Sequence, residues 1–336
     1  ARLMQGLSQR ELADRLPVSD TTVSKYEREE SLPDSAKLMG IAEALGVDLS
    51  YFLRAPRVES IRPAYRKLAS MGKKEETALR ERIRDWLERY LEIESILEFD
   101  GGEFAWPEGF PRPVGSMEEV EEAALDLRQE WQIGLDPIED LASRLEDHRL
   151  RVGRIEGPGT FDACAFLADV NGGLPVIVFN AHPPGDRQRF SMAHELGHLM
   201  LEIGEEIEEE KACNRFSGAF LVPRPAFLDD VGVNRRHVGI DELALLKEKY
   251  GMSMQALVYR MKDLGVLSVA QYKHWFKQFR SPGLHEREPG EPVPRECPRR
   301  FRRMVMRARA EELISERRAA ELLGGEQAIA PETTSA

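Results

Sequence analysis

The sequence predicts an α+β protein in which an all-α N-terminal unit precedes a mixed unit built around one buried helix. Three observations lead to this fold class. The first 54 residues alternate short helical patterns with turn and capping residues. Three short apolar runs between residues 150 and 179 have the length and flanking turns of β-strands. Shortly after them, a helical pattern that is apolar on most sides contains the run His194-Glu195-Leu196-Gly197-His198.

The composition is that of a folded protein with two or more domains: 336 residues, 42% hydrophobic and 32% charged. No apolar run approaches the length of a membrane span and no signal sequence opens the chain, so we expect no membrane contact and a cytoplasmic location. The three cysteines, an odd count without paired spacing, fit reduced thiols there. The net charge of -12 neither requires nor excludes nucleic acid.

Residues 1–54 read as a separate domain of short helices. Ser8 is placed to cap a helix that begins at Gln9, with Glu11 completing a capping box. After a tight turn, Ser19 is placed to cap a second helix that runs to about Arg28. This second helix carries small polar residues on its outer face, which suits insertion into a DNA major groove. The alternative is an ordinary helical hairpin used for protein contact.

The same segment resembles XRE-type helix-turn-helix domains, from Leu7-Ser8-Gln9 through Val23-Ser24-Lys25-Tyr26-Glu27 to Ala44-Leu45-Gly46-Val47. The resemblance implies that residues 1–54 bind a DNA operator, with Gln9 at a phosphate and Asp20, Thr21 and Lys25 near bases. Such units commonly read two half-sites as dimers, so a homodimer is one expected assembly. Glu29 stands where the family often has glycine, which requires either an unusual φ or a different turn. Residues 1–54 hold seven basic and nine acidic residues, so contact with DNA phosphates must rely on the local placement of the basic side chains.

Residues 55–115 read as a linker followed by a long amphipathic helix. The prolines at 56 and 63 indicate the linker. The helix is expected over residues 74–99, with an apolar stripe formed by Leu79, Ile83, Trp86, Leu87, Tyr90, Leu91, Ile93 and Leu97. This stripe fits either a coiled coil or packing on the unit that follows.

Residues 116–270 are expected to form the mixed domain. Two helices, over 118–131 and 138–147, precede strands over 150–155, 163–168 and 175–179. The last two strands are joined through Asn171-Gly172-Gly173, a hairpin signal. The segment Asp162–Leu167 is a candidate edge for an extended peptide, and a core strand is the alternative. Two further helices around Tyr250-Gly251-Met252-Ser253 complete the domain.

The run His194-Glu195-Leu196-Gly197-His198 predicts a metal site. Positions i and i+4 of a helix lie on one face, so both imidazoles point the same way and can hold a zinc ion. A zinc ion lowers the pKa of the water that it binds to about 7, and Glu195 is placed to accept the remaining proton. The sequence therefore predicts Zn2+ as cofactor, His194 and His198 as ligands and Glu195 as the catalytic base.

The third ligand has four acidic candidates in a second helix, which is expected from Glu205 to Leu221 after the first ends at Gly204. Helical phase places Glu210 on the inward stripe with Asn214, Ser217 and Gly218. Glu206, Glu208 and Glu209 point elsewhere and read as a solvated acidic run. We expect Glu210 as the ligand, and Cys213 as small buried filler.

These residues resemble the ImmA/IrrE metallopeptidases, and the similar stretches cover about half of the chain. They are Trp131-Gln132-Ile133-Gly134-Leu135-Asp136-Pro137-Ile138, Arg187-Gln188-Arg189-Phe190-Ser191-Met192-Ala193 with the motif that follows, Glu210-Lys211-Ala212-Cys213-Asn214 with Leu221-Val222-Pro223, and Tyr250-Gly251-Met252-Ser253-Met254-Gln255-Ala256-Leu257. The resemblance implies a zincin-like domain with zinc on His194, His198 and Glu210, and a catalytic Glu195. It also implies a protein substrate, such as a transcriptional repressor, in stress response or mobile-element control.

Residues 271–336 read as a basic helical tail, since residues 273–318 hold thirteen Lys/Arg and seven Asp/Glu. Such a charge run is usually a solvated face, with a second nucleic-acid contact or an autoinhibitory arm as alternatives.

The expected function is that of a zinc-dependent endopeptidase with its own DNA-binding domain. Two alternatives stay open. One is a metal- or ligand-sensing transcriptional regulator, and the other is an antitoxin-like binder with little or no turnover.

Overall fold

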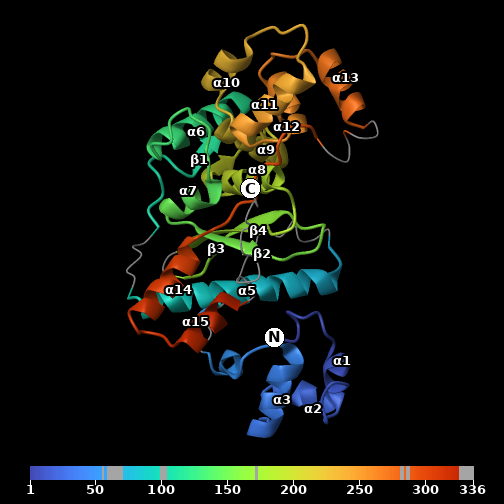
Figure 1. Cartoon of the computed structure of the whole chain (residues 1–336), viewed down its shortest axis with the longest axis vertical. Helices are drawn as coiled ribbons and strands as arrows, with labels where there is room; N and C mark the ends of the chain where they lie inside the picture. The colour runs from blue at the N-terminus through green and yellow to red at the C-terminus, as the bar shows by residue number, and fades with distance from the viewer. Residues whose placement is uncertain are drawn as a thin grey trace. The chain divides into compact units, whose positions relative to one another are not determined.

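The computed structural model describes residues 1–54, 57–58, 71–98, 104–170, 173–280, 284 and 288–324, and its helices and strands are labelled in Figure 1. The chain forms two compact units. Unit 1 consists of Ala1–Gly101, Ala168–Gly173 and Arg299–Ala336, and unit 2 of Gly102–Leu167 and Leu174–Pro298. The α+β class is confirmed, because short strands are interspersed among many helices. No helix in the described ranges is long and apolar enough to cross a membrane.

The N-terminal part of unit 1 contains three α-helices and a short 3-10 helix, α1 (Gln9–Ala13), α2 (Asp20–Glu27), α3 (Ser35–Leu45) and η1 (Leu49–Leu53). The Ser8–Glu11 capping box and the Ser19 cap are both confirmed. A small core of Leu12, Val23, Ile41 and Leu45 joins the helices. Glu29, after α2, has a φ of 61°, so the chain keeps the left-handed turn despite lacking glycine. The linker expected from residue 55 lies mostly outside the described residues.

The rest of unit 1 is the long helix α5 (Lys73–Ile96) with α14 (Arg300–Ala310) and α15 (Glu316–Leu323) beside it (Figure 1). Most of the expected apolar stripe of α5 is buried. Within this unit α5 packs against α14, and the rings of Tyr90 and Phe301 stack with centroids 5.4 Å apart. Since the expected partners were a coiled coil or the following unit, the sequence did not predict this use of the C-terminal helices.

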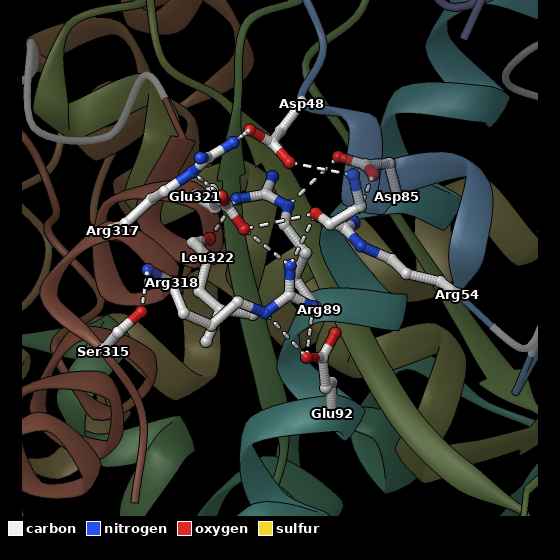
Figure 2. Close-up of polar contacts among 11 residues, drawn as sticks. Asp48, Arg54, Asp85, Arg89, Glu92, Ser315, Arg317, Arg318, Glu321 and Leu322 are labelled. Atoms are coloured by element: carbon white, nitrogen blue, oxygen red, sulfur yellow. Dashed lines mark hydrogen bonds and ion pairs between the residues drawn. The ribbon is translucent and has the colours of Figure 1, made fainter. Parts of the chain in front are cut away.

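Polar contacts join the helix-turn-helix segment to α5 and α15 (Figure 2). Arg317 reaches Asp48 at 2.6 Å, and the side chain of Arg318 donates to Ser50 while also pairing with Glu92 of α5. The pKa of Asp48 is lowered well below its usual range by the backbone N–H of Ser50 and by Arg317. The basic tail therefore provides ion-pair partners for residues far away in the sequence.

Unit 2 contains a three-stranded sheet of β2 (Arg151–Ile155), β3 (Ala163–Ala168) and β4 (Leu174–Asn180) in the order β2-β4-β3. β2 and β4 are parallel, with Arg151 opposite Val176. β3 therefore lies at an edge, where a candidate peptide-pairing strand was expected. Two residues of the expected hairpin turn, 171–172, lie outside the described residues.

The helices of unit 2 enclose one large apolar core. They are α6 (Met117–Glu130), α7 (Leu141–Asp147), α8 (Gly185–Met200), α9 (Glu209–Leu221), α10 (Arg224–Val231), α11 (Ile240–Tyr250), α12 (Met254–Asp263) and α13 (Val269–Phe279). Helix α8 contacts α9 on one side and β4 on another (Figure 1). The helix that carries the histidine motif is thus at the centre of this unit.

Two expectations about the chain around the motif were wrong. Helix α8 ends at Met200, before Gly204, and α9 begins at Glu209, after Glu205. Between them, β5 (Leu201–Ile203) pairs in parallel with β1 (Arg112–Val114), and Gly204 donates its backbone N–H to Val114. Strand pairing with a distant segment outweighs local helix propensity here. Residues up to 298 belong to unit 2, and the expected domain bounds at 54, 115 and 270 stay a prediction.

Candidate metal centre

Helices α8 and α9 face each other in antiparallel fashion, and their paired side chains build the candidate site. His198 faces Glu209 and Glu210, and His194 faces Asn214 one turn further along. One turn beyond that, the hydroxyl of Ser217 donates to the carbonyl of Phe190 at 2.9 Å. Helical repeats of four residues place these groups on one face of each helix. The spacing of these residues along the two helices therefore places them as a row of side chains that face each other across the α8–α9 interface.

The two histidine rings are held by their Nδ1 atoms. His194 Nδ1 lies 2.9 Å from Asn214 Oδ1, and His198 Nδ1 lies 3.1 Å from Glu209 Oε1. Because both partner oxygens only accept, the ring protons are on Nδ1 and the lone pairs on Nε2. The two Nε2 atoms are 3.1 Å apart. Two lone pairs at this distance repel each other, and a shared cation removes the repulsion.

Glu210 completes a set of three donors. One of its carboxylate oxygens is 3.4 Å from His194 Nε2, and the other is 3.6 Å from His198 Nε2. Zinc bonds of about 2.0–2.2 Å in a tetrahedral site separate neighbouring ligand atoms by about 3.3–3.6 Å. The three side chains therefore fit a zinc ion by donor type and by spacing. The Glu210 side chain is 51% exposed, so this face of the site is open to solvent.

Cys213 is a second candidate for the third position. Its sulfur and the nitrogens of His194 and His198 all lie within 4.8 Å of one another. Cys213 is fully buried in the interface between α8 and α9, where a Cβ atom on Gly197 would lie 3.5 Å from the Cys213 Cβ. Thiolate and carboxylate are both zinc ligands, so this residue competes with Glu210 on chemistry while also filling the interface.

Glu195 follows His194 on α8 and is 1% exposed. A carboxylate this deeply buried beside the candidate ligands is excluded from bulk water, which strengthens its electrostatic interactions. Its position directly after a candidate ligand matches the expected position of a general base.

The orientation of α8 depends on a buried arginine in its second turn. Arg189 reaches the carboxylate of Glu296 at 3.0 Å and the carbonyl of Glu139 at 3.0 Å. Glu296 also accepts from the backbone N–H groups of Leu141 and Ala142, which are the first residues of α7. Burial raises the pKa of the Glu296 carboxyl, with Arg189 opposing that shift. This cluster fixes the start of the helix that presents the histidines.

Sequence reasoning missed the roles of Glu209 and Asn214. Glu209 was expected in the solvated acidic run, yet it contacts His198. Asn214 was expected on the inward stripe of α9, but no partner was predicted for it. Its position one helical turn after Glu210 was the signal that could have indicated contact with a histidine of the motif. Glu208 does behave as a solvated residue, since it pairs with Lys211 on the surface.

The expected DNA-contacting residues lie in two different environments. Asp20, Thr21 and Lys25 are exposed on α2. Gln9 at the start of α1 donates to Glu27 at 2.7 Å, and Glu27 is also paired with Arg2. The α2 side chains are available for a groove, whereas Gln9 is already engaged within the domain.

Comparison with known proteins identifies a domain in each half of the chain. A helix-turn-helix family model matches residues 1–52, and the model of the IrrE N-terminal-like domain, a peptidase family, matches residues 159–262. The second match runs from before β3 to α12 and includes His194, Glu195, His198 and Glu210. No curated protein matches the chain. The resemblances stated above are confirmed for these two domains, and the chain combines a DNA-binding fold with a peptidase-family fold.

Proposed function

We propose that this protein is a zinc-dependent endopeptidase that carries its own DNA-binding domain. One observation supports this most strongly: the Nε2 atoms of His194 and His198 and the carboxylate of Glu210 lie at 3.1–3.6 Å from each other. The IrrE-like match over the same residues supports it independently. His194, His198 and Glu210 hold the metal in this proposal.

When bound, zinc supplies a Lewis acid that polarises a peptide carbonyl and makes water a stronger nucleophile. Asn214 and Glu209 orient the two imidazoles through Nδ1, which keeps both Nε2 atoms turned to one point. Glu195 takes the proton from the water that attacks the scissile carbonyl and delivers it to the departing amine. The edge strand β3 offers its backbone groups to an extended segment of substrate.

For the substrate we propose a regulatory protein, such as a transcriptional repressor, cut in a cytoplasmic stress response or in mobile-element control. The presence of a helix-turn-helix domain in the same chain supports this, because DNA binding concentrates the peptidase where regulators bind. The exposed Asp20, Thr21 and Lys25 are proposed to meet bases and Gln9 a phosphate, with two chains on one operator.

The substitution Glu195→Gln tests the enzymatic part. It keeps the size of the side chain and removes the proton acceptor, so we expect zinc content to be unchanged and cleavage to fall about 10²–10⁴-fold. Proteomes of cells that carry wild type or Glu195→Gln should differ in at least one cleaved regulator. A regulatory response that persists at full strength in Glu195→Gln cells would favour the sensing or antitoxin-like alternative.

The substitution Lys25→Ala tests the DNA-binding part. We expect weaker operator protection in footprinting with unchanged peptidase activity, and Lys37→Ala on α3 is the matched control. Absence of any site protected by the wild type would make residues 1–54 a protein-docking domain.

A further inference from the structure

Unit 2 contains a cavity of about 790 Å³ that the proposed reaction does not use. Its walls come from the first half of α8, the middle of α9, helix α12, and the segment over residues 288–293. This volume is within the range of pockets that bind drug-sized ligands. The cavity can therefore hold a bulky side chain of a bound peptide.

The cavity lies next to the candidate metal centre along the α8–α9 pair. Asn214, which contacts His194, also lines the cavity, and so does Phe190, one turn before His194 on the same helix face. Gly218 on α9 also lines the cavity, and a Cβ atom there would lie 3.5 Å from the side chain of Arg260. One helical turn is about 5.4 Å, so the cavity begins about one to two residues of extended peptide away from the candidate ligands.

The lining favours an apolar guest. Apolar and aromatic side chains in it include Phe190, Met252, Ala256, Tyr259 and Phe276. The basic residues in the lining each have a carboxylate partner: Arg187 with Asp162, Arg215 with Glu121 and Asp263, Lys247 with Glu288, and Arg260 with Glu121. An acidic side chain entering the cavity would lose its hydration without gaining an unpaired basic partner, since each basic residue of the lining already has its carboxylate.

One wall of the cavity is fixed in place before any guest arrives. Glu288 accepts from the backbone N–H groups of Met254 and Gln255 at the start of α12, and Glu296 does the same at the start of α7. Between these two anchors the chain passes close over Gly185, where a Cβ atom would lie 2.5 Å from the carbonyl oxygen of Val293. A preformed pocket binds without the entropy cost of ordering its wall.

We propose that this cavity is the specificity pocket of the peptidase, and that it receives a large apolar or aromatic side chain of the substrate next to the scissile bond. This inference rests on the proposed function, since it names the substrate preference of the same site. The proposal predicts that every cleavage site has a Phe, Tyr, Leu or Met at the same position relative to the scissile bond.

Two readouts on the 336-residue chain test this pocket. A random peptide library is digested with zinc-loaded wild type, and the same library is selected for binding by the zinc-loaded Glu195→Gln protein. Both should show Phe, Tyr, Leu or Met at one position. Ala256→Trp fills the pocket and should lower kcat/KM for such peptides at least about tenfold. Ala310→Trp, on the exposed face of α14, is the control, and Ala256→Leu is a smaller step in case Ala256→Trp does not fold.

The outcomes separate the pocket from the peptidase activity. Binding preference that is lost in the Ala256 variants and kept in Ala310→Trp supports the pocket, even when the wild type cuts no peptide and the peptidase proposal fails. Cleavage without a preferred side chain, or with a preference that the Ala256 variants leave unchanged, overturns the pocket while the peptidase stands. If the protein neither binds nor cleaves any peptide of the library, both the pocket and the peptidase proposal are overturned. If an apolar dye binds in the cavity and no peptide displaces it, the cavity is a site for small molecules and the proposal is overturned.

Discussion

The ion pairs that support helix α8 differ from those that attach the helix-turn-helix segment to α5 and α15. In unit 2, Arg189 and Glu296 are 5% and 3% exposed, and Arg260 with Glu121 is similarly buried. In unit 1, Arg317 is 76% exposed where it pairs with Asp48, and Arg318 with Glu92 is only partly buried. Buried pairs lose much stability when one partner is removed, whereas exposed pairs contribute little and are screened by salt.

This difference matches what each region has to do. The proposed metal centre would require the α8 histidines to stay within about 0.5 Å of their positions. The buried cluster around Arg189 holds the start of α8, and salt screens such buried pairs much less than exposed ones. The helix-turn-helix segment is attached to α5 and α15 by contacts that respond to ionic strength, as does DNA binding itself. We infer that the framework around the candidate metal centre is rigid and that the attachment of the helix-turn-helix segment is adjustable.

The largest expected effect is on the buried side of the comparison. Glu296→Ala leaves Arg189 buried without its carboxylate and removes the acceptor for two backbone N–H groups at α7. We expect the free energy of unfolding of unit 2 to fall by about 3–5 kcal/mol in chemical denaturation. The control Glu291→Ala, exposed in the same segment, should stay within about 0.5 kcal/mol of wild type. A cost below about 1 kcal/mol for Glu296→Ala would show that this cluster does not hold α8.

A smaller effect of opposite sign is expected at Glu29, which has a φ of 61°. Glycine adopts this conformation without the steric cost that a Cβ imposes, so Glu29→Gly should stabilise the helix-turn-helix segment by about 1 kcal/mol. Glu30→Gly, at the next exposed position, should be neutral or slightly destabilising. Thermal melts of the three proteins check this. Equal destabilisation by both substitutions would mean that the turn after α2 is not under strain.

The smallest effect is expected at Arg318, on the exposed side of the comparison. Arg318→Ala removes contacts to Glu92 and Ser50, and should weaken protection of α3 and η1 from hydrogen exchange by under about 1 kcal/mol at low salt. The loss should shrink further at high salt, and Arg302→Ala on α14 should have no effect. A loss that salt leaves unchanged would place this network with the buried pairs.

The features that sequence predicted are those with short spacing. The Ser8 capping box, the motif at 194–198 and the choice of Glu210 depend on helical periodicity over at most sixteen residues. The contacts of Arg318 with Ser50 and of Glu296 with α7 join residues more than 150 positions apart and leave no periodic pattern. The strand β5 was missed for the same reason, because its partner β1 lies almost ninety residues earlier. The role of Glu209 was missed because helical phase places it beside the inward stripe of α9, and from there its side chain still reaches His198.

The central claim is that His194, His198 and Glu210 hold one zinc ion, and metal titration of four purified proteins tests it most directly. We expect wild type and Glu208→Gln to bind about one zinc per chain, and Glu210→Gln to bind it much more weakly. Cys213→Ala should retain the metal if this residue only fills the interface. Full zinc affinity in Glu210→Gln together with its loss in Cys213→Ala would contradict the assignment and make the thiolate the third ligand.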